Sequence, residues 1–169
     1  MREVTLPIQA RTAARDFESF FRAEYGTLCR ALLLLVGDAF EAEEIAQETM
    51  TRVLERWDRV GAMDSPTGYA YRTALNLQRK RIRRLAVRAK RRFASVPVGD
   101  IGPEAGERYD VRRALASLPD GQRAALILVD WLDMDTEEAA RALGIKPASV
   151  RVRLHRARSA VRDALGATS

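Results

Sequence analysis

The stretch Asp135–Arg158, DTEEAARALGIKPASVRVRLHRAR, predicts two short helices separated by a tight turn. Asp135 is suited to cap the first helix, and Glu138, three residues later, completes a capping-box pattern. Gly144 permits the left-handed turn that ends this helix, and Pro147 suits the first turn of the next one. The pattern is typical of a helix-turn-helix. The apolar residues expected to face the core are Ala139, Ala140 and Leu143 in the first helix, and Val150, Leu154, Ala157 and Val161 in the second.

The second of these helices is strongly basic on its outward face. No acidic residue lies between Arg141 and Arg158. The outward positions hold Arg151, Arg153, His155, Arg156 and Arg158. Because a solvated helix normally mixes both signs of charge, this face favours a polyanionic partner.

The composition of the whole chain agrees with a helical protein that binds nucleic acid or an acidic surface. Its 169 residues carry a formal net charge of +6, and 31% of them are charged while 47% are hydrophobic. Strand-like alternation of apolar and polar residues is scarce, so we predict an all-α fold. The length suits two small helical domains joined by a flexible linker, the second of which contains the helix-turn-helix.

Several classes of function are disfavoured by what the sequence lacks. With one histidine, one cysteine, no glycine-rich phosphate loop and no metal-ligand spacing, we expect no enzyme, catalytic residue, metal, cofactor or small-molecule substrate. Cys29 cannot form an internal disulfide, which fits a reducing compartment. The longest apolar run, Ala31–Val36, is too short to cross a bilayer, and Met1–Ala14 lacks a signal-peptide core. We therefore expect a cytoplasmic protein without membrane insertion.

Periodicity and composition divide the chain into four parts. Residues without a helical pattern precede Asp16, which is suited to cap a helix that runs to Gly37. Two prolines and three glycines mark the linker. The expected boundaries are 1–15 for a flexible arm, 16–93 for the first domain, 94–108 for the linker and 109–169 for the second domain. No further C-terminal domain is expected, since the chain ends just after the last predicted helix.

A second helix after Gly37 is predicted to have one apolar and one acidic side. From Gly37 to Asp64, both included, there are eight acidic residues and three arginines. The buried side is expected to hold Ala42, Ile45, Ala46, Thr49, Val53 and Trp57. The opposite side holds Glu44, Gln47, Glu48, Thr51 and Glu55. From the residues alone, this acidic side is either a docking surface or an ordinary solvated face.

A third helix is predicted after a loop at Val60–Thr67, and its exposed side is basic. Between Asp64 and Asp100 there are ten basic residues and no acidic one, which favours phosphate contacts. The expected buried stripe is Tyr71, Leu75, Gln78, Ile82, Leu85 and Ala89. A second row along the same helix is Arg72, Asn76, Arg79, Arg83 and Lys90.

From about Phe17 to Leu165, these blocks in this order resemble the extracytoplasmic-function sigma factors, a class of bacterial transcription initiation factor. AEEIAQETMTRVLERWDRV resembles the polymerase-binding helix of the family, and SPTGYAYRTALNLQRKRIRR resembles its promoter-melting segment. LASLPDGQRAALIL and ALGIKPASVRVRLHRAR resemble its duplex-binding region. The resemblance implies an all-α protein that binds core RNA polymerase, at the β′ clamp and the β flap, and promoter DNA. An anti-sigma protein is a further implied partner.

The resemblance also implies a role for each basic or acidic surface. The residues implied for docking on the β′ clamp are Glu44, Gln47, Glu48 and Thr51. Those implied for the pocket that holds the single-stranded minus-ten element are Gly61, Ala62, Met63, Asp64 and Ser65, with Arg72, Asn76, Arg79 and Arg83 along the following helix. Those implied for the minus-thirty-five duplex are Lys146, Ala148, Ser149, Arg151, Val152, His155 and Arg156, with Arg153 a further phosphate partner.

Some positions remain open or depart from the family pattern. Tyr71 and Trp57 are expected in the core. Tyr69 could either pack in the core or stack on a DNA base. His155 could either contact DNA or lie in solvent without a partner. The departures are Lys146 where Ser is common, Lys80 for Asp, Leu75 for Arg and Ala139 for Ile. The alternative function is a stand-alone helix-turn-helix regulator that binds duplex DNA without polymerase.

Overall fold

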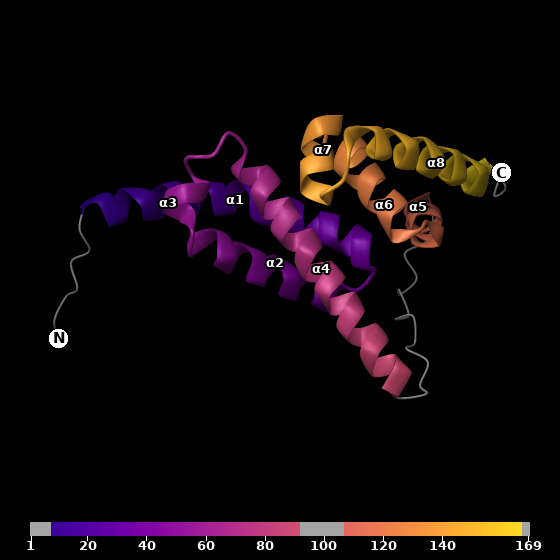
Figure 1. The fold of residues 1–169 in the computed structure, drawn as a ribbon, viewed down its shortest axis with the longest axis horizontal. Helices are drawn as coiled ribbons and strands as arrows, with labels where there is room; N and C mark the ends of the chain where they lie inside the picture. Colours follow the sequence, from indigo (N-terminus) through magenta and orange to yellow (C-terminus); the bar gives the residue numbers. More distant parts are fainter. Residues whose placement is uncertain (1–7, 92–106, 167–169) are drawn as a thin grey trace.

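The computed structural model describes the backbone of residues 8–91 and 107–166, and the side chains of residues 16–84 and 111–166. Every regular element in these ranges is helical, as predicted (Figure 1). An N-terminal module consists of α1 (Ile8–Val36), α2 (Ala39–Leu54), α3 (Trp57–Val60) and α4 (Pro66–Arg91). A C-terminal module consists of α5 (Glu107–Ser117), α6 (Asp120–Leu126), η1 (Ile127–Trp131), α7 (Thr136–Leu143) and α8 (Pro147–Gly166).

The first helix is longer than its apolar pattern predicts. It begins at Ile8, so the expected cap at Asp16 is wrong and half of the expected arm is helical. Asp16 lies exposed inside the helix. Residues 8–15 contain three alanines and no glycine or proline, so they favour a helix without needing a buried face. Residues 1–7 of the expected arm lie outside the described residues.

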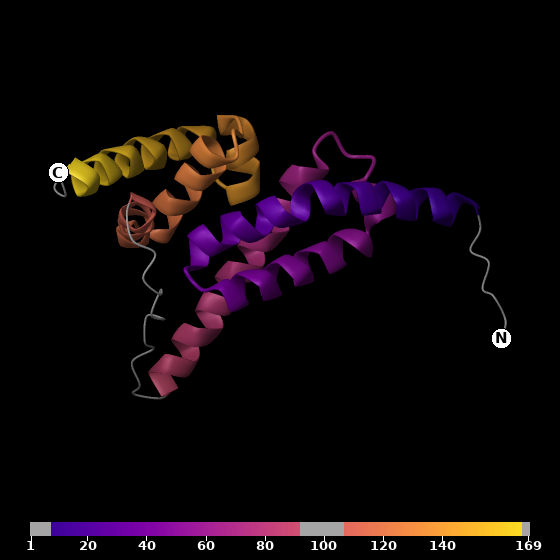
Figure 2. The same cartoon turned by 180° about the vertical axis from the view of Figure 1, so that it is seen from behind.

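The N-terminal module is built on the antiparallel pair α1 and α2, which lie side by side in Figures 1 and 2. Gly37, with φ 82°, makes the turn between them, and the Asp38 carboxylate accepts a 2.7 Å hydrogen bond from the Glu41 amide as the cap of α2. The predicted buried positions of α2 are confirmed from Ala42 to Val53. Trp57 instead starts the separate helix α3, where its ring packs against Phe17 and Phe20.

The predicted buried stripe of α4 is confirmed over its first half only. Tyr71, Leu75 and Gln78 are buried, but Ile82 is 41% exposed, so its expected place in the core is wrong. In Figure 1 the C-terminal end of α4 projects beyond α1 and α2, so these helices do not cover its apolar side along the whole length. The side chains of Leu85 and Ala89 lie outside the described residues.

The helix-turn-helix forms with the predicted caps. The Glu138 amide donates to the Asp135 carboxylate at 2.7 Å, and the Asp135 amide donates to the Glu138 carboxylate at 3.3 Å. Gly144 adopts the left-handed conformation, with φ 66° and ψ 37°. Along α8 the stripe formed by Val150, Leu154 and Ala157 is buried, as predicted.

The helix that precedes this unit is not uniform. The segment from Asp120 to Trp131 begins as the α-helix α6 and continues as the π-helix η1, after which the Leu132 amide donates to the Ile127 carbonyl at 3.1 Å. The wider turn leaves Trp131 41% exposed. The expected linker ends earlier than predicted, because α5 already begins at Glu107, and residues 92–106 lie outside the described residues.

The two modules pack against each other in one continuous apolar core. Buried residues of α1, α2 and α4 join those of α6, η1, α7 and α8 in a single cluster. Helix α7 packs against α4, while α1 lies against α5, α6 and η1. Two arginines bridge the modules: Arg79 of α4 donates to the Leu143 carbonyl at 2.9 Å, and Arg123 of α6 donates to the Leu35 carbonyl at 2.8 Å. We call this contact region the seam.

Replacing Gly144 with Ala is expected to lower the free energy of unfolding by about 1–2 kcal/mol, because the left-handed conformation strains any residue with a Cβ. Urea denaturation followed by circular dichroism measures the change. Gly26→Ala is the matched control, since Gly26 lies inside α1 with only the end of the Arg30 side chain nearby. That control should raise the stability by about 0.5–1 kcal/mol. Equal effects of the two changes would contradict the role of Gly144.

Candidate nucleic-acid interface

The outward side of α8 is an exposed, basic surface. Six of the seven residues predicted for duplex recognition are exposed here: Lys146, Ala148, Arg151, Val152, His155 and Arg156. The seventh, Ser149, is half-buried, and its amide donates to the Lys146 carbonyl at 2.9 Å. The Val150 amide reaches the same carbonyl at 3.2 Å, so this backbone oxygen closes the first turn of α8. The Lys146 side chain remains exposed beside the recognition residues.

Two other arginines of α8 are engaged within the protein. Arg158 forms a two-bond ion pair with Asp130, at 2.6 and 2.9 Å, and this hydrogen bonding raises the pKa of its guanidinium. Arg153 is half-buried and covers Gly121 in the first turn of α6, where an added Cβ would come within 2.8 Å of a guanidinium nitrogen. Fewer arginines of α8 are therefore available to a partner than its sequence suggests.

The row along α4 is exposed except at its centre. Arg72, Asn76 and Arg83 are exposed, whereas Arg79 is half-buried and hydrogen-bonded to α7. Burial lowers the pKa of the Arg79 guanidinium, and the charges of Arg153 and Arg83 lower it further.

A polar cavity of about 560 Å³ lies between α2 and α4. It joins residues predicted for two different partners: Glu48 and Thr51 on α2 with Arg72 and Asn76 on α4. Its other lining residues are Arg52, Glu55, Arg56, Tyr69 and Thr73. The loop residues 61–65 do not line this cavity.

Tyr69 and Arg56 form one wall of this cavity. The Arg56 guanidinium donates to the Tyr69 hydroxyl at 3.1 Å, and this hydrogen bond lowers the pKa of Tyr69. The Tyr69 ring packs on the apolar cluster that contains Val53 and Val60. Tyr69 therefore belongs partly to the core and partly to the cavity. Arg56 is not among the predicted site residues. Helix α2 ends before it, so the helical spacing of α2 does not show on which side the Arg56 side chain lies. Tyr71 is buried, as predicted.

The loop at 61–65 is supported from beneath by Trp57. The Gly61 amide donates to the Trp57 carbonyl at 2.7 Å, and a Cβ on Gly61 would come within 3.0 Å of the indole. The Ser65 hydroxyl accepts a 3.0 Å hydrogen bond from the Gly68 amide at the start of α4. Gly61, Ala62 and Asp64 are exposed, while Met63 and Ser65 are half-buried.

The acidic side of α2 is exposed, but two of its carboxylates are already paired. Glu44 accepts from Arg81 of α4 at 2.8 Å, and Glu48 accepts from Arg52 at 2.7 Å. Gln47 and Thr51 are exposed on the same side of α2. Exposed pairs of this kind contribute little stability, typically about 0–1 kcal/mol, so a partner can replace them at low cost.

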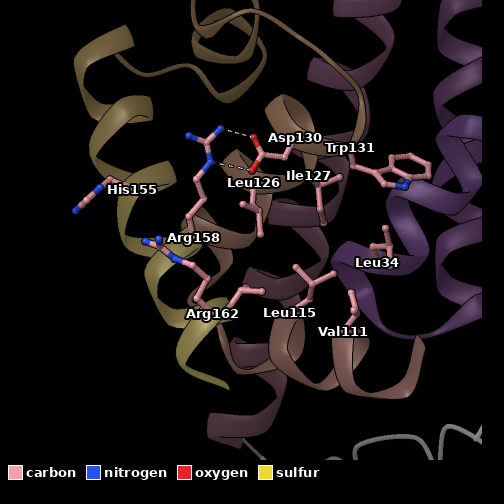
Figure 3. Close-up of a pocket in the computed structure, with 11 residues that line it drawn as sticks. Leu34, Val111, Leu115, Leu126, Ile127, Asp130, Trp131, His155, Arg158 and Arg162 are labelled. Atoms are coloured by element: carbon pink, nitrogen blue, oxygen red, sulfur yellow. Dashed lines mark hydrogen bonds and ion pairs between the residues drawn. The ribbon is translucent and has the colours of Figure 1, made fainter. Parts of the chain in front are cut away.

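A second, apolar hollow of about 770 Å³ was not foreseen from the sequence. It lies between α1, α5, η1 and α8, and its walls include Leu34, Val111, Leu115 and Trp131 (Figure 3). The Asp130–Arg158 ion pair spans one side of it. The sequence places apolar residues on α5 and at Trp131, which is the only indication of this hollow that it contains. The wider turn that exposes Trp131 could not be predicted.

Two further findings concern membranes and metals. None of the helices in residues 8–91 and 107–166 is both long and apolar enough to cross a membrane. Within the same ranges, no group of three or more His, Cys, Asp and Glu side chains is placed to hold a metal ion.

Comparison with known families defines the class of protein. Residues 20–88 match the family described as Sigma-70 region 2, and residues 108–161 match Sigma-70, region 4. The first match covers most of the N-terminal module and the second covers the helix-turn-helix. The two modules therefore correspond to regions 2 and 4 of Sigma-70.

Individual relatives narrow the class. The chain is 31% identical over 148 residues to the ECF RNA polymerase sigma factor ShbA of Streptomyces griseus, covering 79% of this chain and 78% of the relative. It is 29% identical over 152 residues to the RNA polymerase sigma-E factor of Streptomyces coelicolor, covering 89% and 86%. The sigma factor RpoE of Bartonella quintana, solved in complex with the anti-sigma factor NepR, has the same fold, with a TM-score of 0.79 at 20% identity over 90% of this chain and 98% of that one. The chain belongs to the extracytoplasmic-function sigma factors.

As a member of this family, the protein binds core RNA polymerase and directs it to promoter DNA. This confirms the prediction made from the sequence blocks. It also sets aside the alternative of a stand-alone regulator, because that alternative does not account for the region 2 match.

Proposed function

We propose that three surfaces of this sigma factor each bind one component of the initiation complex. The acidic side of α2 docks on the β′ clamp, the loop 61–65 and α4 hold the minus-ten strand, and α8 reads the minus-thirty-five duplex. The observation that carries this division is the separation of charge: exposed carboxylates gather on α2, while exposed arginines gather on α4 and α8.

The assignment of α8 rests on its exposed side chains. An arginine in the major groove can donate two hydrogen bonds to one guanine, and small side chains can contact thymine methyl groups. Arg151, Val152 and Ala148 offer these groups near the N-terminal end of α8, the end that enters the groove in helix-turn-helix proteins. Lys146 and Arg156 flank them and are placed for phosphates. His155 is exposed on the same side.

The assignment of α4 rests on its row of exposed donors and on the adjoining cavity. Single-stranded DNA is held by basic grooves that follow the backbone and by aromatic rings that stack on bases. The cavity between α2 and α4 supplies both, through Arg56, Arg72 and Tyr69. We therefore add Arg56 and Tyr69 to the proposed strand-binding surface, next to the loop 61–65.

The remaining assignments complete the proposal. The two proposed domains begin with α1 at Ile8 and with α5 at Glu107, and they are joined by the segment between α4 and α5. The C-terminal domain also contacts the β flap. An anti-sigma protein is a further proposed partner, because a protein of the same fold was solved with one. We propose that the protein acts in the cytoplasm and has no catalytic activity, cofactor or small-molecule substrate of its own, so that binding free energy within the holoenzyme drives promoter opening.

Two single substitutions test the division between reading and holding DNA. Arg151→Ala is expected to cost roughly 1–3 kcal/mol at one position of the minus-thirty-five element and to relax the preference there. Arg83→Ala is expected to weaken all promoters by a similar factor and to flatten the dependence on salt, because it removes a phosphate contact. Transcription of a randomised promoter library by the reconstituted holoenzyme, at two salt concentrations, measures both.

Arg84→Ala provides the control for this experiment. Arg84 is exposed on α4 next to Arg83 but lies away from the row, so its loss should change neither preference nor overall strength by more than about twofold. Uniform weakening by Arg151→Ala, or a change at a single base position by Arg83→Ala, would contradict the proposed roles.

A further inference from the structure

Arg79 lies in the middle of the row on α4 that is proposed to hold the promoter strand, but its guanidinium is turned to the C-terminal module. Residues 72, 76, 79 and 83 share one side of a helix, since each step turns it by about 100°. The neighbours Arg72, Asn76 and Arg83 are exposed, while Arg79 is half-buried under α7. The seam therefore covers part of the proposed strand-binding surface.

The acceptor of Arg79 is a carbonyl at the C-terminal end of α7. Leu143 is the last residue of α7, and its carbonyl accepts the 2.9 Å hydrogen bond from Arg79. The neighbouring carbonyls of Ala140 and Arg141 accept bonds from the backbone of the turn, at Gly144 and Ile145. Arg79 thus completes the cap of α7, where the ends of the peptide dipoles favour a positive charge.

Small side chains allow α7 to approach α4 closely. Ala139, Ala140 and Ala142 are all buried, together with Leu143, so most of the circumference of this eight-residue helix is covered. On the other side of the seam, Leu75 is 2% exposed and belongs to the same apolar cluster. These apolar contacts define where α7 lies, and the hydrogen bond from Arg79 crosses between the modules at the C-terminal end of α7.

The charged groups nearest to Arg79 do not balance the positive charge of its guanidinium. The neighbouring charged groups are Arg83 on its own helix and Arg153 on α8, both of the same sign. No carboxylate pairs with Arg79 among the described side chains, and a neutral carbonyl is its acceptor. A phosphate oxygen carries a full negative charge and forms a stronger, charge-assisted hydrogen bond with a guanidinium.

We infer that Arg79 is a shared donor, bonded either to α7 across the seam or to a phosphate of the promoter strand. The inference rests on the proposed function of the α4 row. Because the Arg79 guanidinium is half-buried under α7 while the neighbouring side chains of its row are exposed, it must leave the Leu143 carbonyl to reach a phosphate that lies along the exposed face. Binding of the strand therefore removes the cap of α7 and loosens the C-terminal module from α4. By the same linkage, the closed seam lowers the affinity of the free protein for the strand.

The test compares Arg79→Ala with Arg83→Ala in the full-length protein. Small-angle scattering reports the radius of gyration, and hydrogen–deuterium exchange reports the opening of the α7 peptide bonds. Arg79→Ala should shift the ratio of closed to open protein about tenfold toward open, which is the effect of losing one hydrogen bond with a charged donor. Both the radius and the exchange of α7 should rise. Arg83→Ala should change neither, because Arg83 is exposed outside the seam.

A single-stranded minus-ten oligonucleotide provides the second arm. In the wild-type protein it should slow exchange in residues 61–84 and, at the same time, speed exchange in α7. In Arg79→Ala it should no longer change α7. A strand that protects residues 61–84 but leaves α7 unchanged in the wild type would overturn the inference, as would equal radii and exchange for the two variants.

The two arms separate this inference from the proposed function. Absence of any protection in residues 61–84 at saturating oligonucleotide would refute the proposed strand-binding row and the competition that depends on it. The role of Arg79 in closing the seam would still be decided by the first arm, which contains no DNA.

Discussion

Replacing Gln47 and Glu48 together with Lys is expected to abolish capture of core RNA polymerase while leaving the protein folded. Both residues lie on the outer side of α2, and the double change adds three positive charges there. Glu48 is 41% exposed and pairs with Arg52 and, more distantly, Arg81, so a Lys at this position would meet two like charges. Like charges placed across an interface typically cost several kcal/mol, which corresponds to a loss of affinity of about a hundredfold or more.

The control for this prediction is the double change Glu18→Lys with Ser19→Lys on α1. It adds the same three charges to an exposed helix, and Glu18 pairs with Arg22 four residues later, just as Glu48 pairs with Arg52. Pull-down with purified core polymerase should succeed for the control and fail for the α2 variant. Circular dichroism and urea denaturation should give similar stabilities for both. If the α2 variant still captured polymerase, its acidic side would be only a solvated face.

The helix-turn-helix was predictable from its sequence because its determinants are local. The capping box joins residues 135 and 138, and the left-handed turn depends only on Gly144. The buried stripe of α8 follows from its own spacing. Each of these features involves positions a few residues apart, so no knowledge of distant packing was needed.

Ile82 shows where this reasoning fails. Helical spacing identifies the side of α4 that could be buried, but whether another helix covers that side depends on how far α1 and α2 extend. Ile82 is 41% exposed, although it lies on the apolar side of α4. The start of α1 at Ile8 fails for a related reason, because a helix can extend past its buried face where propensity alone is favourable.

The candidate interface was predicted in its composition but not in its arrangement. Sequence indicated which side chains of α2, α4 and α8 share an outward face, and the structure leaves most of them exposed. The pairing of Arg56 with Tyr69 joins residues 13 positions apart across a short helix, and the bond from Arg79 to Leu143 joins positions 64 apart. Such contacts depend on tertiary packing, which helical periodicity does not encode.

Replacing Arg123 with Ala is expected to cause the largest loss of stability of any single arginine substitution considered, at about 3 kcal/mol. Its guanidinium donates to three carbonyls around the end of α5, those of Leu115, Ala116 and Leu118, at 2.8 to 3.0 Å. A fourth bond, of 2.8 Å, crosses the seam to the Leu35 carbonyl of α1. Its side chain is 14% exposed, so water can replace these bonds only in part.

Two comparisons identify the cause of this loss. Arg158→Ala removes a two-bond ion pair with Asp130, but the Arg158 side chain is 52% exposed, so the expected cost is below about 1 kcal/mol. Arg123→Lys keeps the charge but not the planar fork of donors, so it should recover only a minor part of the stability. Because Arg123 joins both modules, its loss should also increase hydrogen exchange at the C-terminal ends of α1 and α5 together. Exchange that rises at the end of α5 alone would mean that the bond to Leu35 contributes little to holding the modules together.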